Sequence, residues 1–188
     1  MPSQLIELIF DGDNEKVAKL LDKDKELSIS SYDGKSALYW ACLLGMCDIV
    51  ETLIRSGADP NDTDSDGESP LHVAASSEDI NCIDSLLYYD AIVDQATNEG
   101  ITPLMIAAKE GSVKMVKQLL DAGANPMALD LSKRNVLHWS ALGEHDDSDL
   151  IALLLENGAD PLVKNLNGKL PLEYAKTLNK INIYNALK

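Results

Sequence analysis

The chain has 188 residues, enough for one domain or one short array of repeats, and 45% of them are hydrophobic, which excludes a disordered chain. Its 16 basic and 31 acidic side chains give a formal charge of −15, which disfavours nucleic acid and anionic membranes as partners. The longest apolar run, Ala37 to Cys47, is well short of the ~20 residues that span a bilayer, and the first residues lack the basic region of a signal peptide. We therefore expect an intracellular protein, in the cytoplasm or alternatively in the nucleus.

The same residue types return along the chain every 33 residues. One apolar column consists of Leu5, Leu38, Leu71, Leu104 and Leu137, and a second consists of Val17, Val50, Ile83 and Val116. A slip of two residues falls best within 143–150, after which Ile151 and Leu154 rejoin the columns. Such a period indicates stacked units, each of which buries its apolar face on its neighbours.

In chain order, the pattern predicts a single domain over 1–188 that begins and ends with a cap. The segments are a cap at 3–33, repeats at 34–66, 67–99, 100–132 and 133–167, and a cap at 168–188. Both caps are more polar than the middle repeats, as the end units of a stacked array need to be for solubility.

Each period predicts two short helices, as the segment from Gly67 to Ala91 illustrates. Ser69 is placed to cap the first helix, and Pro70 occupies its first position, where the missing N–H costs nothing. The apolar residues of the two helices are Leu71, Ala74 and Ala75, then Ile80, Ile83, Leu86 and Leu87. Neither helix is long enough to be stable alone, so packing between repeats must stabilise both.

A glycine follows the second helix of most repeats. Gly57, Gly123 and Gly158 each precede Ala-Asp or Ala-Asn and then proline, which is typical of a left-handed residue that ends a helix. Asp90 fills this slot in the remaining repeat, and Asp tolerates the left-handed region better than most residues. We therefore predict a left-handed backbone at Asp90.

These segments resemble the ankyrin repeat. The family's turn-and-helix signature is matched by "GESPLHVAA" (67–75) and "GITPLMIAA" (100–108), and its closing phrase by "LIRSGADPN", "LLDAGANPM" and "LLENGADPL". The resemblance implies an all-α solenoid of paired antiparallel helices with about four full repeats plus caps. It also implies a module that binds another protein or a peptide through a concave groove and the turn tips, without catalysis.

The only two tryptophans, Trp40 and Trp139, occupy the same position of their repeats. Within the resemblance this position faces the groove, so an apolar stripe with aromatic residues is expected there, and such stripes mark interaction surfaces. The alternative is that each ring only fills space against the neighbouring turn. The predicted partner-binding residues are Tyr32, Trp40, Leu43, Asp66, Glu68, Val73, Glu99, Ile101, Ile106, Leu131, Arg134, Trp139 and Leu142.

Acidic residues crowd the segment from Asp59 to Glu68, which includes Asp64. The spacing lacks the frame of a calcium loop, so we interpret the segment as a turn between repeats. Together with Asp33, Asp94 and Glu99, its carboxylates are expected to form an acidic rim beside the groove. That rim suits a partner with basic residues, whose association rate it would raise.

The sequence predicts no catalytic residues, no cofactor and no metal site. His72 and His138 stand where the family's histidine binds turn backbone, and His145 lies in a loop that the two extra residues lengthen. Cys42, Cys47 and Cys82 have apolar neighbours and are expected to be small buried residues in a reducing compartment. We expect a monomeric adaptor or inhibitor, with a non-catalytic regulatory or structural subunit of a larger enzyme complex as the alternative.

The resemblance also directs attention to Asn61. Family members carry an asparagine in the closing phrase that hydroxylases modify, and Asn61 stands in that slot. Asp94, Met127 and Leu162 occupy the same slot of the other repeats and do not match it.

Overall fold

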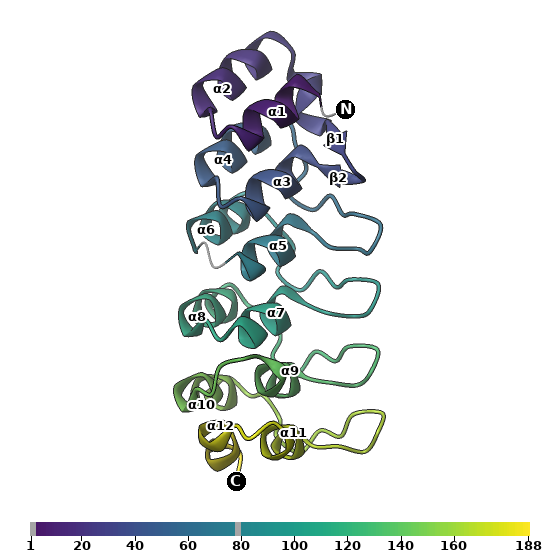
Figure 1. Cartoon of the computed structure of the whole chain (residues 1–188), viewed down its shortest axis with the longest axis vertical. Helices are drawn as coiled ribbons and strands as arrows, with labels where there is room; N and C mark the ends of the chain where they lie inside the picture. Colours follow the sequence, from purple (N-terminus) through teal and green to yellow (C-terminus); the bar gives the residue numbers. More distant parts are fainter. Residues whose placement is uncertain (1–2, 78–79) are drawn as a thin grey trace. The chain divides into compact units, whose positions relative to one another are not determined.

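The computed structural model describes residues 3–77 and 80–188, and helices make up almost all of the regular secondary structure in these residues (Figure 1). It divides into two compact units, residues 1–92 and 93–188, which are described one at a time. The all-α repeat fold predicted from the sequence is confirmed, whereas the single domain over 1–188 stays a prediction.

The described residues of unit 1 (1–92) form three helix pairs. Its elements are α1 (Gln4–Phe10), α2 (Asn14–Lys23), a 3₁₀ helix η1 (Lys25–Ile29), β1 (Ser31–Tyr32), β2 (Lys35–Ser36), α3 (Ala37–Leu43), α4 (Cys47–Arg55), α5 (Pro70–Ser76) and α6 (Ile80–Tyr88). The first helices α1, α3 and α5 pack side by side next to the loops, and α2, α4 and α6 form a second row on the side away from the loops (Figure 1).

Unit 2 (93–188) repeats this arrangement. Its elements are α7 (Pro103–Glu110), α8 (Val113–Asp121), α9 (Val136–Leu142), α10 (Ser148–Glu156), α11 (Pro171–Thr177) and α12 (Ile181–Ala186). The helix α9 packs between α7 and α11 in the first row, and α10 packs between α8 and α12 in the second (Figure 1).

The apolar columns of the sequence form the core of each unit. Leu5, Leu38 and Leu71 in unit 1, and Leu104 and Leu137 in unit 2, are all at most 1% exposed. Burial of a leucine side chain contributes about 1.5–3 kcal/mol, so these columns hold helices together that are too short to be stable alone.

The predicted helix ends are also confirmed. Pro70 opens α5, and the Ser69 N–H donates a hydrogen bond to Nδ1 of His72 at 3.1 Å. Asp90 has a φ of 62°, in the left-handed region that Gly57 (113°) and Gly123 (93°) also occupy. Aspartate thus replaces glycine without a change in the way this helix ends.

One polar residue per repeat holds each loop that precedes a first helix. The side chains of Asp64, Thr97, Asp130 and Asn165 each accept the N–H four residues further along their own loop, over 2.8–3.2 Å. The first loop differs because Asp33 and Gly34 are both left-handed and close the β1–β2 hairpin, a turn that Asp-Gly favours. The all-α prediction did not include this short hairpin.

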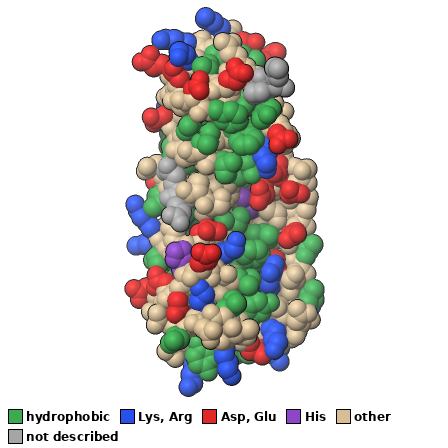
Figure 2. All heavy atoms as spheres, in the orientation of Figure 1, with side chains coloured by type: hydrophobic (Ala, Val, Ile, Leu, Met, Phe, Trp, Pro, Cys, Tyr) green, Lys and Arg blue, Asp and Glu red, His purple; other side chains and the backbone are tan. Residues whose placement is uncertain are grey.

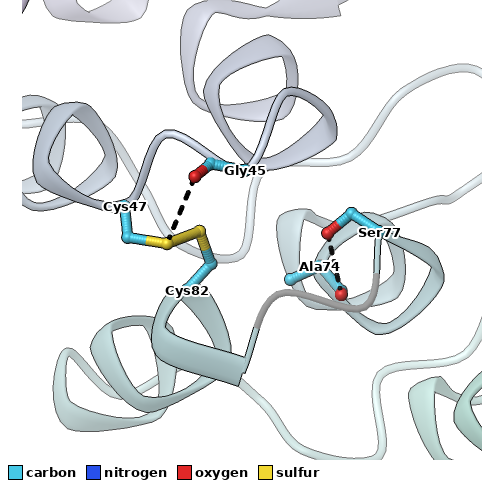
Figure 3. The surroundings of a disulfide bond; sticks show 5 residues. All are labelled: Gly45, Cys47, Ala74, Ser77 and Cys82. Atoms are coloured by element: carbon cyan, nitrogen blue, oxygen red, sulfur yellow. Dashed lines mark hydrogen bonds between the residues drawn. A yellow bond between two sulfur atoms is a disulfide. The ribbon is translucent and has the colours of Figure 1, made fainter. Parts of the chain in front are cut away.

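The expectation of three buried cysteine thiols is wrong for two of them. Cys47, the first residue of α4, forms a disulfide with Cys82 of α6, with a Cα–Cα distance of 4.8 Å (Figure 3). The two are 35 residues apart, close to one period, so the stacking of α4 on α6 brings them side by side. Cys42 is unpaired and buried, as predicted.

The loop between α9 and α10, which the two extra residues lengthen, contacts other helices of unit 2. Gly143 is buried and lies so close to Lys109 of α7 that a side chain there would overlap the Lys109 carbonyl. The Asp146 carboxylate accepts the N–H groups of Asn182 (3.1 Å) and Ile183 (2.9 Å) at the start of α12. Although burial raises its pKa, these backbone hydrogen bonds outweigh the effect and lower it. The loop therefore links α7, α9 and the last helix pair.

Among the helices of the described residues, none is long and apolar enough to cross a membrane.

Candidate partner-binding faces

An exposed aromatic and aliphatic surface lies over α1 and α3 in unit 1. The rings of Phe10 and Trp40 meet edge to face with centroids 5.3 Å apart, and Tyr32 lies 6.2 Å from each. Beside them Leu43 and Leu44 are 42% and 44% exposed. Hydrophobic side chains gather over these helices in Figure 2, with acidic side chains at their edge. We call Phe10, Tyr32, Trp40, Leu43 and Leu44 the unit 1 patch.

Trp40 is anchored within the unit 1 patch but not sealed in the core. Its indole N–H donates a hydrogen bond to the Tyr32 carbonyl at 3.1 Å, which fixes the ring against the β1–β2 hairpin. The side chain is half-buried, and its neighbour Phe10 is 41% exposed. A fixed aromatic platform of this kind can bind an apolar side chain with little further loss of conformational entropy.

The negative charge of the protein is concentrated in unit 1. Residues 1–92 include six Lys and Arg against nineteen Asp and Glu, a formal charge of −13. Residues 93–188 include ten against twelve, a formal charge of −2. The unit 1 patch therefore lies in a strongly negative field, which attracts basic partner segments.

Only part of the expected acidic rim is available to a partner. Lys35 bonds Asp64 at 2.7 Å, the Asp64 side chain is 3% exposed, and the Tyr39 hydroxyl donates to Glu68 at 3.2 Å. Burial lowers the pKa of Lys35, but the hydrogen bonds to Asp64 and Tyr39 outweigh it and raise that pKa. Asp64 is thus structural, because its ion pair joins the first two loops. The exposed carboxylates here include Asp33 and Asp66.

Val73 does not contribute to the face on which the sequence placed it. It is 3% exposed on α5, in a segment from Pro70 to Ala75 that is buried throughout. The valine side chain is too short to reach the surface that the Trp40 ring reaches from the equivalent position of α3. The prediction that Val73 belongs to an accessible apolar stripe is therefore wrong, and Val73 is a core residue.

In unit 2 the second tryptophan is held by a buried ion pair. The Trp139 indole N–H donates to Oδ2 of Asp130 at 3.1 Å, and Nε of Arg134 donates to the same oxygen at 2.6 Å. The Arg134 guanidinium also lies over the Trp139 ring, 4.6 Å from its centroid. The Asp130 side chain is only 1% exposed, so its charge is compensated from within unit 2. The Trp139 N–H, the Arg134 Nε–H and one face of the Trp139 ring are therefore already occupied by contacts within unit 2.

A shallow apolar cavity in unit 2 is lined by residues of α9 and α11, two neighbouring helices of the first row. Its volume is about 270 Å³, and Leu142, Tyr174 and Leu178 are among the residues that line it. Tyr174 occupies the position of α11 that Trp139 occupies in α9, and its hydroxyl accepts a hydrogen bond from the Asn165 amide at 2.8 Å. The cavity therefore exposes a second apolar surface, in a unit with little net charge.

The remaining predicted contacts of unit 2 lie on its loops and on α7. Leu131 is 71% exposed at a loop tip, and its N–H donates to the Glu99 carbonyl at 2.8 Å. The Glu99 side chain is exposed, and Ile101 and Ile106 are half-buried. These residues are accessible to different degrees, and their role in binding stays a prediction.

Four residues that line these two surfaces are absent from the predicted set of partner-binding residues. Phe10 and Leu44 complete the unit 1 patch, and Tyr174 and Leu178 line the cavity of unit 2. Counting in periods could have found Phe10 and Tyr174, because they fall in the columns of Leu43 and Trp139. The weak copies of the motif in the terminal segments concealed that signal.

The side chains of His138 and Asn61 make hydrogen bonds that join neighbouring repeats. Nε2 of His138 lies 3.0 Å from the Lys169 carbonyl, and its Nδ1 accepts the Asn135 N–H at 3.2 Å. The Asn61 amide bridges two repeats, since it donates to the Asp90 carbonyl and accepts the Ile92 N–H. Within the described residues, no group of three or more His, Cys, Asp or Glu side chains could hold a metal ion.

Comparison with known protein families agrees with the helix pairs and their period. A family model described as ankyrin repeats (3 copies) matches residues 5–64 and 44–130, and one described as ankyrin repeat matches residues 132–166. Ankyrin repeats generally mediate protein–protein interactions, and proteins of this kind are typically non-catalytic. The matches cover most of the chain, and on that basis the chain belongs to the ankyrin repeat family.

Proposed function

We propose that this protein is an interaction module that binds a protein partner or peptide through the unit 1 patch. The observation that supports this most is the exposed cluster around Phe10, Trp40 and Leu44 in a unit with a formal charge of −13. The occupant would be a segment with apolar anchors and with Lys or Arg close to them. Apolar contact would supply most of the affinity, and charge would mainly raise the association rate.

The protein itself catalyses no reaction in this proposal. As an adaptor it would hold its partner for another protein, and as an inhibitor it would cover a surface that its partner needs. The alternative is a regulatory or structural subunit of an enzyme complex, in which the same patch would bind a neighbouring subunit. Monomeric state and a cytoplasmic location stay predictions.

The test compares variants that leave the core intact. Leu43 and Leu44 are more than two-fifths exposed, so the double substitution L43S/L44S removes apolar contact area without opening a cavity. The matched control is L162S/L166S, at positions of unit 2 that are 74% and 63% exposed. Each protein is immobilised, exposed to cell lysate at low and at physiological salt, and the retained proteins are quantified by mass spectrometry.

We expect a retained protein that the wild type and L162S/L166S share and that L43S/L44S loses. The affinity of that protein should fall by about tenfold to a hundredfold in L43S/L44S, and its association rate should fall as salt rises. Equal retention by L43S/L44S and the control would show that the unit 1 patch is not the binding surface.

A further inference from the structure

We propose that Cys47 and Cys82 are a reversible thiol–disulfide pair that exchanges with glutathione and so controls the mobility of the segment next to the unit 1 patch. For its functional consequence this inference rests on the proposed function, because Leu43 and Leu44 belong to that patch. The chemical part, exchange at the two sulfurs, stands on the local structure alone.

The disulfide lies close to the patch along the chain. Only Gly45 and Met46 separate the exposed Leu44 from Cys47. Cys47 is bonded to Cys82 of the next repeat (Figure 3), so the bond fixes the far end of the turn that follows Leu43, the last residue of α3, and begins at Leu44. Opening the bond removes the one covalent link between α4 and α6 other than the chain itself. The turn would then be held by non-covalent packing only.

Small thiols can approach the pair from one side. Cys47 is half-buried and lines a cavity of about 360 Å³ together with Gly12, Met46 and Asn81. Cys82 is 0% exposed. The Cys47 sulfur is therefore the one that an incoming thiol or disulfide reaches, and Cys82 is the resolving residue. Cys42 is also 0% exposed, and burial raises the pKa of its thiol, so it is protected from the same chemistry.

The surroundings of Cys47 suit both redox states. It is the first residue of a nine-residue helix, and the positive end of a helix dipole stabilises a thiolate. Its Sγ lies 3.6 Å from the Gly45 carbonyl (Figure 3). In the disulfide this sulfur carries no hydrogen, but the reduced thiol can donate one to that carbonyl. The reduced state thus has a hydrogen-bond partner in place.

The exchange balances as two successive thiolate attacks. In closing, the Cys47 thiolate attacks one sulfur of glutathione disulfide, which releases one glutathione thiolate and leaves a mixed disulfide on Cys47. The Cys82 thiolate then attacks the Cys47 sulfur and releases the second glutathione thiolate. Two protein thiols are oxidised and one glutathione disulfide is reduced to two thiols. In opening, a glutathione thiolate attacks the Cys47 sulfur and the Cys82 thiolate leaves. A second glutathione thiolate then attacks the glutathione sulfur of the mixed disulfide, which releases the Cys47 thiolate and one glutathione disulfide.

The first measurement uses the full-length wild-type chain and needs no partner. The folded protein is equilibrated with reduced glutathione or with glutathione disulfide, then labelled with a maleimide and weighed by mass spectrometry. We expect two labels in the first buffer and none in the second, with Cys42 labelled only after unfolding. The melting temperature should fall by about 5–10 °C on reduction. A pair that stays closed in reduced glutathione, or stays open in glutathione disulfide, overturns the proposal.

The second measurement tests the link to the patch. In a W139F background Trp40 is the only tryptophan, and its quenching by acrylamide reports access to the patch. We expect acrylamide to quench Trp40 more strongly in the reduced protein than in the oxidised protein. C47S/C82S should show the strong quenching in both buffers. The matched control C42S should show the same difference between the two buffers as the protein with all three cysteines. Unchanged quenching would overturn the link while leaving the exchange chemistry in place. Neither readout involves the partner, so a failure of the proposed function, seen with L43S/L44S, is distinguished from a failure of this inference.

Discussion

The indole N–H of Trp139 and the Arg134 guanidinium converge on one carboxylate oxygen of Asp130, at 3.1 and 2.6 Å. The other oxygen accepts the Arg134 backbone N–H at 2.8 Å. Because the Asp130 side chain is 1% exposed, water cannot replace any of these partners. One buried carboxylate therefore holds the loop before α9, the Trp139 ring and the Arg134 guanidinium in place.

We predict that Asp130→Asn lowers the free energy of unfolding by about 2–4 kcal/mol. The amide removes the negative charge that compensates Arg134, and in one orientation its NH₂ group faces two donors. Urea denaturation followed by circular dichroism measures the change. The exposed Asp121 of unit 2 provides the control, since Asp121→Asn should change stability by less than about 0.5 kcal/mol. Equal stability of the two variants would show that the buried contact contributes little.

Asp90 allows a test of backbone strain. Its φ of 62° lies in the left-handed region, where a residue with a Cβ is disfavoured and glycine is not. Asp90→Gly should therefore be neutral or stabilise the protein by up to about 1 kcal/mol, measured as the shift of the thermal unfolding midpoint. Asp90→Ala keeps a Cβ but loses the tolerance of aspartate for this region, so it should destabilise the protein. A clear loss of stability in Asp90→Gly would contradict this account of the helix end.

The 33-residue period predicted the structural features that recur from repeat to repeat, such as the buried leucines and the left-handed helix ends. Leu38, Leu71 and Leu104 are buried alike, and Asp90 takes the conformation of the glycines, because each repeat places the same position in the same surroundings. The position shared by Trp40 and Val73 shows the limit of this reasoning. The backbone register is the same, but side-chain length decides that one residue reaches the surface and the other stays in the core.

Interactions between repeats are harder to predict from one sequence. The disulfide joins residues 35 apart, and that separation, close to one period, is a signal that two positions on neighbouring helices will meet. The ion pair of Lys35 with Asp64 spans 29 residues and has no such signal, because it joins different positions of two loops. Phe10 was missed for another reason, since the terminal repeat keeps the helix pair but little of the motif.

His138 gives the protein a pH dependence whose sign follows from its surroundings. Burial lowers the pKa of His138 below its usual value near 6.5, although the hydrogen bond to the Lys169 carbonyl opposes the shift. The unfolded chain therefore binds a proton more readily than the folded protein does. The stabilising contribution is complete above pH 6.5 and is lost as the pH falls through the lower pKa of the folded state.

We expect an NMR titration to place the pKa of His138 below 6.5, and His138→Asn to flatten part of the decline in unfolding free energy between pH 7 and pH 5. The comparison with His138→Asn is needed because protonation of the many carboxylates also changes stability in acid. A titration midpoint above 6.5 would mean that the folded protein favours the charged ring, and the predicted decline would then reverse.

Gly143 marks the point where the lengthened loop meets α7. Its φ of −63° is open to any residue, so only space requires a glycine here. A methyl group would overlap the carbonyl oxygen of Lys109, which belongs to a helix backbone and cannot move aside as a flexible side chain could. We predict that Gly143→Ala lowers the free energy of unfolding by roughly 3 kcal/mol. Ser148→Ala, at an exposed position that begins α10, is the control and should cost less than about 1 kcal/mol. Hydrogen exchange would show which elements are destabilised in Gly143→Ala. Amides of α7, α9 and α12 should lose protection together, because Asp146 of the same loop caps α12. Loss of protection confined to the loop would show that the loop does not link these helices.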